Sequence, residues 1–155
     1  MKLKNSHLIA IRQLDQKLLV YRPLLATSAP ADGWIVTLRK ALNMSLRQLG
    51  DKLSMTAQGM KDVEKREADE TITLKSLAEA GDALNMKFVY GFVPKNGSLE
   101  EMIESKAREQ ALKIVKRTST TMKLEDQENS NSRLKQAVDE LTQEIKREMP
   151  RNLWD

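Results

Sequence analysis

The chain contains no cysteine, and this absence excludes disulfide bonds and thiolate metal ligands. Histidine is almost as scarce. The single histidine, His7, lies near the N-terminus, where we expect an exposed side chain. One histidine and no cysteine supply neither the ligand cluster of a typical zinc site nor the Ser–His or Cys–His pair of a nucleophilic enzyme. The sequence therefore predicts no metal, no cofactor and no catalytic residue, and it argues against an enzyme.

Long apolar runs and aromatic residues are also rare. No run approaches the roughly 20 apolar residues that span a bilayer, and the charged residues spread over positions 1–22 argue against a signal peptide. Aromatic residues make up 4% of the chain and apolar residues 40%, so an aliphatic core is expected. We expect a protein of the cytoplasm that does not use a membrane.

Charge, by contrast, is abundant. Charged residues make up 31% of the 155 residues, and the balance of 26 Lys and Arg against 22 Asp and Glu gives a net charge of +4. The sequence pI is about 9.3. A mildly basic protein is compatible with nucleic acid as a partner, but this charge does not require one.

Apolar residues at helical spacing predict helices near both ends of the chain. A stripe at intervals of three and four residues covers positions 8–25. Toward the C-terminus, a Ser98–Glu101 capping box introduces a long helix over 98–125, and a further helix is predicted over 134–149.

Composition divides the chain into parts. A stretch of small residues, proline and glycine at 27–33 predicts a linker. Trp154 lies in the short tail after the last helix, and we expect it to dock on a surface that the sequence does not identify. The expected parts are an N-terminal helix at 1–26, a compact domain at 33–85, a strand at 86–94 and a helical region at 98–155.

The strand prediction rests on a change of period. Apolar residues alternate with others from Met86 to Phe92, and the pattern ends at Pro94. A single strand has no partner in its own chain. We therefore expect its edges to be covered or to pair with a second molecule.

Between 33 and 85 the predicted helices are short and closely spaced. Two of them are joined by little more than Ser54 and Met55, and they begin at Ser45 and Thr56, residue types that cap helix N-termini. Two short helices joined by a tight turn are typical of a helix-turn-helix, whose second helix lies in the major groove of DNA.

The outward residues of the second helix suit that task. Gln58 carries an amide that can contact adenine through two hydrogen bonds, and Lys61 can reach guanine or a phosphate. Positive side chains flank both residues, and the helix N-termini offer N–H groups to phosphates. The alternative, a charged helix face that meets only water, remains open at this point.

Residues 33–85 resemble the Cro/CI-type helix-turn-helix domain of the Xre family. The resemblance is carried by "LRKALNMSLRQLGDKL", by a third helix of the form T-x-x-x-M-x-x-V-E, and by "LKSLAEAGDALN". It implies that the start of the third helix reads bases, here through Ala57, Gln58, Lys61 and Asp62. Ala57 stands where the family often has glutamine. The predicted DNA-binding residues are Ser45, Arg47, Gln48, Lys52, Thr56, Ala57, Gln58, Lys61, Lys65 and Arg66.

The same resemblance implies a structural ion pair. Arg39 in the first short helix and Glu64 in the third occupy positions that often pair in the Cro/CI family. We expect the two side chains to be partly buried together, with an exposed and weaker pair as the alternative.

A second resemblance covers almost the whole chain up to Gln127. The segments "RQLDQKL…RPL", "P-x-x-GWI", "FVYGFVP" and "TMKLEDQ" resemble the family called mobile mystery protein A. The resemblance implies a regulator or antitoxin encoded beside a Fic-domain protein, an AMP-transferring toxin type. Thr121 and Glu125 approach the inhibitory motif of Fic proteins, but Asp126 stands where Gly or Asn belongs, so inhibition by that motif is not supported.

These features predict a mainly α fold, with a five-helix Cro/CI-like helix-turn-helix core, one short β-strand and extra N- and C-terminal helices. The favoured function is a sequence-specific repressor, acting as a homodimer on a double-stranded operator of its own mobile or toxin–antitoxin-like operon. The alternative is an antitoxin or adaptor that acts mainly by binding a Fic-domain partner. Salt-dependent binding to specific DNA distinguishes the two functions.

Overall fold

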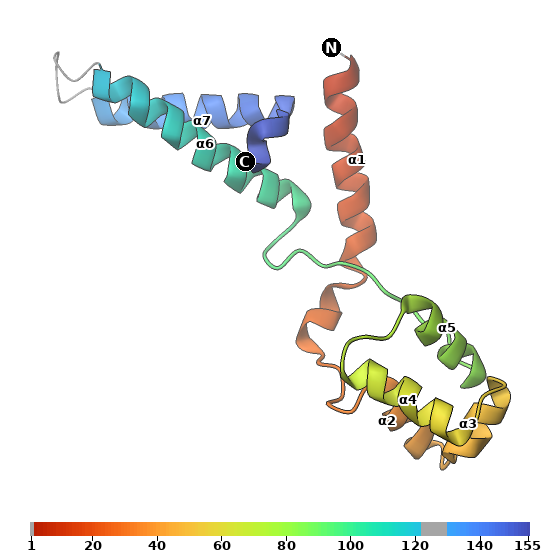
Figure 1. The fold of residues 1–155 in the computed structure, drawn as a ribbon. Coiled ribbons are helices and arrows are strands. Elements are labelled where there is room, and N and C mark those ends of the chain that lie inside the picture. Colours follow the sequence, from red (N-terminus) through yellow and green to blue (C-terminus); the bar gives the residue numbers. More distant parts are fainter. Residues whose placement is uncertain (1, 122–129) are drawn as a thin grey trace. The chain divides into compact units, whose positions relative to one another are not determined.

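The computed structural model describes residues 2–121 and 130–155, and these residues form seven α-helices, two 3-10 helices and no strand. The fold is therefore mainly α, as predicted. In chain order (Figure 1) the elements are α1 (Lys2–Leu19), η1 (Arg22–Ala26), α2 (Trp34–Ala41), α3 (Leu46–Lys52), α4 (Ala57–Ala68), α5 (Leu74–Ala83), α6 (Leu99–Thr121), α7 (Ser130–Glu148) and η2 (Arg151–Trp154).

The elements fall into two compact units. The central unit consists of Pro23–Gly91, and the terminal unit joins Met1–Arg22 to Phe92–Asp155. The N-terminal helix, which we expected to stand apart, thus belongs with the C-terminal helices. Its helical stripe was expected to continue to residue 25, but α1 ends at Leu19. Pro23 explains the break, because it has no N–H to donate to the Leu19 carbonyl four residues earlier.

Helices α2 to α5 surround the small aliphatic core of the central unit. Each of the four contributes at least one buried side chain, so the helices are stabilised mainly by one another. Four α-helices take part where five were expected. The buried residues are Ile35, Leu49, Met60, Val63, Ala80 and Leu84.

Polar caps set the starts of these helices. The predicted capping box of α3 is present: the Ser45 hydroxyl accepts from the Gln48 N–H at 3.1 Å, and the Gln48 side chain accepts from the Ser45 N–H at 2.8 Å. Thr56 caps α4, also as predicted, by accepting from the Gly59 N–H at 3.0 Å. One such cap stabilises a helix by about 1 kcal/mol.

Helix α2 takes its cap from another helix. The N–H groups of Trp34 and Ile35 donate to the carboxylate of Glu67 in α4, at 2.8 and 2.9 Å. Gly33 precedes them with a φ of +89°, and a Cβ at this position would lie 2.7 Å from the Glu67 carboxyl carbon. Only glycine combines that backbone conformation with so close an approach.

The predicted strand over 86–94 is not formed. Phe88 and Tyr90 do lie on the same side, with ring centroids 6.0 Å apart, as alternate residues of an extended chain would place them. A strand also requires a neighbouring segment for its hydrogen-bond ladder, and the described part of the chain supplies none. Val89 and Tyr90 are 61% and 65% exposed.

In the terminal unit α6 and α7 lie side by side and antiparallel (Figure 1). Helix α1 packs against both, with Ile11 at their core. The small residues Ala107 and Ala111 of α6 meet Val138 and Ile145 of α7 in the core. The apolar stripe predicted for the last helix is thus the face that it buries. Thr142 is buried among these residues, with its hydroxyl donating to the Val138 carbonyl at 2.6 Å.

The C-terminal tail docks on the terminal unit through Leu153, and Trp154 does not dock there. Leu153 is 1% exposed and belongs to the α6–α7 core, whereas Trp154 is 52% exposed. The Gln110 side chain of α6 also donates to the Asn152 carbonyl at 2.6 Å. The 3-10 turn places one of the two neighbouring apolar side chains inward and the other outward.

Helix α6 has two caps. Ser98 accepts from the Glu101 N–H at 3.1 Å, as the sequence predicted. The carboxylate of Asp15, in α1, also accepts from the N–H groups of Leu99 and Glu100, at 2.8 and 3.2 Å. The negative charge of Asp15 thus lies at the positive end of the α6 dipole, where it is stabilising.

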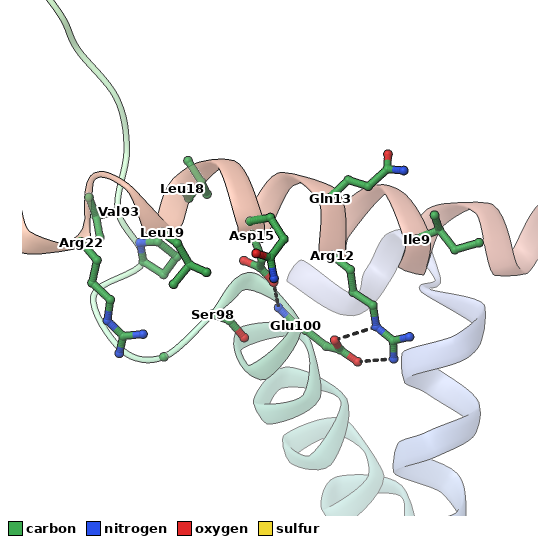
Figure 2. A pocket seen from close by; sticks show the side chains of 13 residues that line it. Ile9, Arg12, Gln13, Asp15, Leu18, Leu19, Arg22, Val93, Ser98 and Glu100 are labelled. Atoms are coloured by element: carbon green, nitrogen blue, oxygen red, sulfur yellow. Dashed lines mark hydrogen bonds and ion pairs between the residues drawn. The ribbon is translucent and has the colours of Figure 1, made fainter.

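Beside this cap, charged side chains join all three helices of the terminal unit. Arg12 donates two hydrogen bonds of 3.0 Å to Glu100, and the Lys146 ammonium lies 3.1 Å from Glu100 and 2.7 Å from Glu104. The network borders a cavity of about 550 Å³ between α1 and residues 93–100 (Figure 2). Hydrogen bonds, first from Arg12 and then from Lys146, lower the pKa of Glu100 to about 2.

We expect the terminal unit to lose stability as the pH falls from about 4.5 to about 2. Within this window the carboxylate of Glu100 stays ionised in the folded protein but takes up a proton in the unfolded chain, so acid favours unfolding. Melting temperatures of the wild type and of Glu100→Gln across this window measure the effect. Glu144→Gln, an exposed change on α7, is the control. Equal pH dependence in all three proteins would contradict the prediction.

Candidate nucleic-acid interface

Helices α3 and α4 are joined by the four residues Leu53–Thr56. The N–H groups of Leu53 and Met55 donate to the Gly50 carbonyl, at 2.9 and 3.0 Å, which closes the turn tightly. A Cβ on Gly50 would lie 2.8 Å from the Met55 carbonyl oxygen. Glycine at this position therefore permits the close approach of the turn to the end of α3.

Helix α4 has one buried and one exposed face. Met60, Val63 and Glu64 are buried against the central unit. The opposite face presents a polar stripe at helical spacing, and all its members are exposed. We call it the α4 stripe; it consists of Gln58, Lys61, Asp62 and Lys65.

The structure places every predicted DNA-binding residue on the surface of α3, α4 or their N-caps. Ser45, Gln48 and Thr56 use their side chains to cap helices, so these side chains are already hydrogen-bonded to the protein's own backbone. The whole predicted set is exposed: Ser45, Arg47, Gln48, Lys52, Thr56, Ala57, Gln58, Lys61, Lys65 and Arg66.

The positive side chains of this surface are available to a negatively charged partner. Lys52, Lys61, Lys65 and Arg66 form no ion pair with any residue in the described ranges. Arg47 lies 4.0 Å from Asp51, and both side chains are at least 70% exposed, so their attraction is weak in water. Neutralisation of phosphates by these cations would release counterions and make binding salt-dependent.

The structure brings Arg39 and Glu64 together behind this surface. The Arg39 guanidinium donates to both Glu64 carboxylate oxygens, at 2.5 and 3.2 Å, and to the Met44 carbonyl at 2.9 Å. The two side chains are only 11% and 8% exposed. The hydrogen bonds to Glu64 raise the pKa of Arg39 above its ordinary value. The pair ties α2 to α4 and so fixes the orientation of the α4 stripe.

One contact of the stripe was not predicted. The Gln58 side-chain amide donates to a carboxylate oxygen of Asp62 at 3.0 Å, one turn further along α4. The signal was present in the sequence, because glutamine and aspartate four residues apart on a helix are within hydrogen-bonding distance. The Cro/CI resemblance places Asp62 at a base-reading position, although Asp62 is not among the ten predicted DNA-binding residues.

Across 2–121 and 130–155, no three His, Cys, Asp or Glu side chains are grouped so as to hold a metal ion. In the same ranges no helix is long and apolar enough to cross a membrane. Glu125 and Asp126, which decide the comparison with the Fic inhibitory motif, lie outside the described residues.

Comparisons of the chain with protein-family models, with curated proteins and with solved structures gave no match. The geometry of the α3–α4 surface and the chemistry of its side chains therefore carry the functional argument.

Proposed function

We propose that the central unit is a Cro/CI-type DNA-binding domain and that the chain is a sequence-specific repressor of its own operon. The observation that carries the proposal is the pairing of α3 and α4 through a closed four-residue turn, with the α4 stripe exposed. In a helix-turn-helix of this kind the second helix enters the major groove, and its first turns meet base edges. Both sequence resemblances support the same role.

The residues of the surface divide by chemistry into readers and anchors. Gln58 and Lys61 lie in the first turns of α4, where an amide and an ammonium group distinguish bases by their hydrogen-bonding edges. Lys52, Lys65 and Arg66 lie to either side and suit phosphate contacts, which position a protein without reading sequence.

We also propose that the protein acts as a homodimer. A single helix-turn-helix contacts few base pairs, and two-fold dimers gain affinity by reading two half-sites. The segment 86–94 is the proposed point of contact, because its β-strand pattern has no ladder partner in residues 2–121 and 130–155, and its Val89 and Tyr90 side chains are exposed. Antiparallel pairing with the same segment of a second copy would satisfy its backbone groups.

An antitoxin or adaptor that binds a Fic-domain protein is the second candidate. The observation that favours it lies on α1, where Ile9 and Leu19 both line the cavity beside residues 93–100 and are 54% and 48% exposed. Exposed apolar side chains gathered at a cavity suit contact with another protein. In this case DNA binding would be secondary.

Selection of binding sites from a randomised duplex library, with the full chain, tests the repressor. We expect a two-fold symmetric site, with Gln58→Ala weakening binding by about 1–3 kcal/mol and relaxing the preference at one or two base pairs in each half-site. Lys65→Ala should weaken binding to all sequences about equally and reduce the salt dependence by roughly one phosphate contact.

The control is Lys17→Ala, which removes an exposed lysine from α1 and should change neither property. Retention of the full sequence preference by Gln58→Ala would show that α4 does not read the bases. Selection of an unrepeated site would oppose the homodimer, and weak binding that ignores sequence would favour the antitoxin.

A further inference from the structure

Asp62 is an unexpected residue in a surface that meets DNA. It lies in the α4 stripe between Lys61 and Lys65, and its side chain is exposed. A carboxylate at this place repels the phosphates that the neighbouring lysines attract. Among the described residues, its side chain accepts a 3.0 Å hydrogen bond from the Gln58 amide.

That hydrogen bond determines which way round the Gln58 amide lies. An ionised carboxylate only accepts hydrogen bonds, so the NH₂ end of the amide must face Asp62 and the oxygen must face away. One N–H of the amide is used by Asp62. The second N–H and the oxygen stay available to a ligand.

A donor and an acceptor side by side match one base in the major groove. Adenine presents N7 as an acceptor and its N6 amino group as a donor, and a glutamine amide can bind both. With the amide reversed, the NH₂ end of Gln58 would face the adenine amino group and one hydrogen bond would be lost. The orientation of the amide therefore matters for which base pair is read.

We propose that Asp62 is a positioning residue, which holds the Gln58 amide in the orientation that reads an A·T pair. The inference rests on the proposed DNA-binding function and says which base pair that site prefers. Asp62 lowers the general attraction to DNA and in return sharpens the choice of one base pair. The rival role for Asp62 is direct reading of a base, since a carboxylate can accept from the amino group of cytosine.

A double-mutant cycle separates these roles. The probes are the duplex selected by the wild-type full chain and duplexes with each A·T pair of that site changed in turn to G·C. We expect Asp62→Ala to bind unrelated DNA more tightly but to lose about 5- to 10-fold of the discrimination at one A·T pair, within the range of a bidentate amide–base contact. In a Gln58→Ala background, the same change should no longer affect discrimination at that pair.

Asp62→Asn provides the conservative variant. Its side-chain oxygen still accepts from Gln58 although the charge is gone, so discrimination should be retained while binding to unrelated DNA rises. Asp51→Ala is the charge-matched control: it removes an exposed carboxylate from α3 and should leave discrimination unchanged. In the free protein, the Gln58 side-chain amide protons should shift in nuclear magnetic resonance spectra of Asp62→Ala but not of Asp51→Ala.

The outcomes distinguish this inference from the proposed function. If Asp62→Ala left discrimination unchanged, the positioning role would be overturned while the proposed function stood. If Asp62→Ala reduced discrimination equally in the wild type and in Gln58→Ala, Asp62 would read a base directly and the positioning role would again be overturned. Unshifted amide protons in Asp62→Ala would overturn the hydrogen bond itself. Failure of the wild type to select any sequence would overturn the proposed function, and the role of Asp62 with it.

Discussion

Replacement of Glu64 by alanine is expected to lower the free energy of unfolding of the central unit by about 3–5 kcal/mol, the cost of leaving a buried charge without its partner. Arg39 is only 11% exposed in the wild type, and without Glu64 it would keep the Met44 carbonyl as its hydrogen-bond partner. The two hydrogen bonds from Arg39 of α2 to Glu64 of α4 would be lost as well. Chemical denaturation monitored at residues of the central unit measures the change.

The same unit offers a matched control. Lys75 and Glu79 also form an ion pair, but it is 3.9 Å long and its side chains are 85% and 55% exposed. Glu79→Ala should cost less than about 1 kcal/mol, because water screens an exposed pair and already solvates both charges. A loss in Glu64→Ala no larger than in Glu79→Ala would show that burial adds nothing to the Arg39–Glu64 pair.

Local sequence signals predicted the central unit well. Ser45, Gln48 and Thr56 announce the starts of α3 and α4 because a cap acts over three residues, within one segment of chain. The apolar spacing likewise identified the buried faces of these helices. The positions of the candidate interface residues follow from these two short-range signals, which is why all of them lie on the exposed surface.

The features that the sequence did not predict depend on partners far along the chain. Asp15 caps a helix that begins 84 residues later, and Glu67 caps one that begins about 30 residues earlier. Neither pairing leaves a local pattern. The strand predicted over 86–94 is absent for a related reason. The alternating pattern is present in the sequence, but a strand also requires a neighbouring segment for its hydrogen bonds, and no local pattern supplies one.

The C-terminal tail gives the second large expected effect. Leu153→Ala should destabilise the terminal unit by about 2–5 kcal/mol, because it removes buried methyl groups and leaves a cavity. Leu153 is 1% exposed and packs in one cluster with Ile103 and Ala107 of α6. Trp154 is the larger of the two neighbouring apolar residues, yet it is 52% exposed. The 3-10 turn can direct only one of the two side chains into the core, and that side chain is Leu153.

Amide hydrogen exchange of the full chain tests this effect, because it reports each unit separately. Each unit has a core of its own, so Leu153→Ala should speed exchange in α6 and α7 and leave α3 and α4 protected as in the wild type. Trp154→Ala is the control and should change stability by about 0.5 kcal/mol or less, as surface substitutions usually do. If Trp154→Ala were the more damaging of the two, the tail would be anchored by the tryptophan after all.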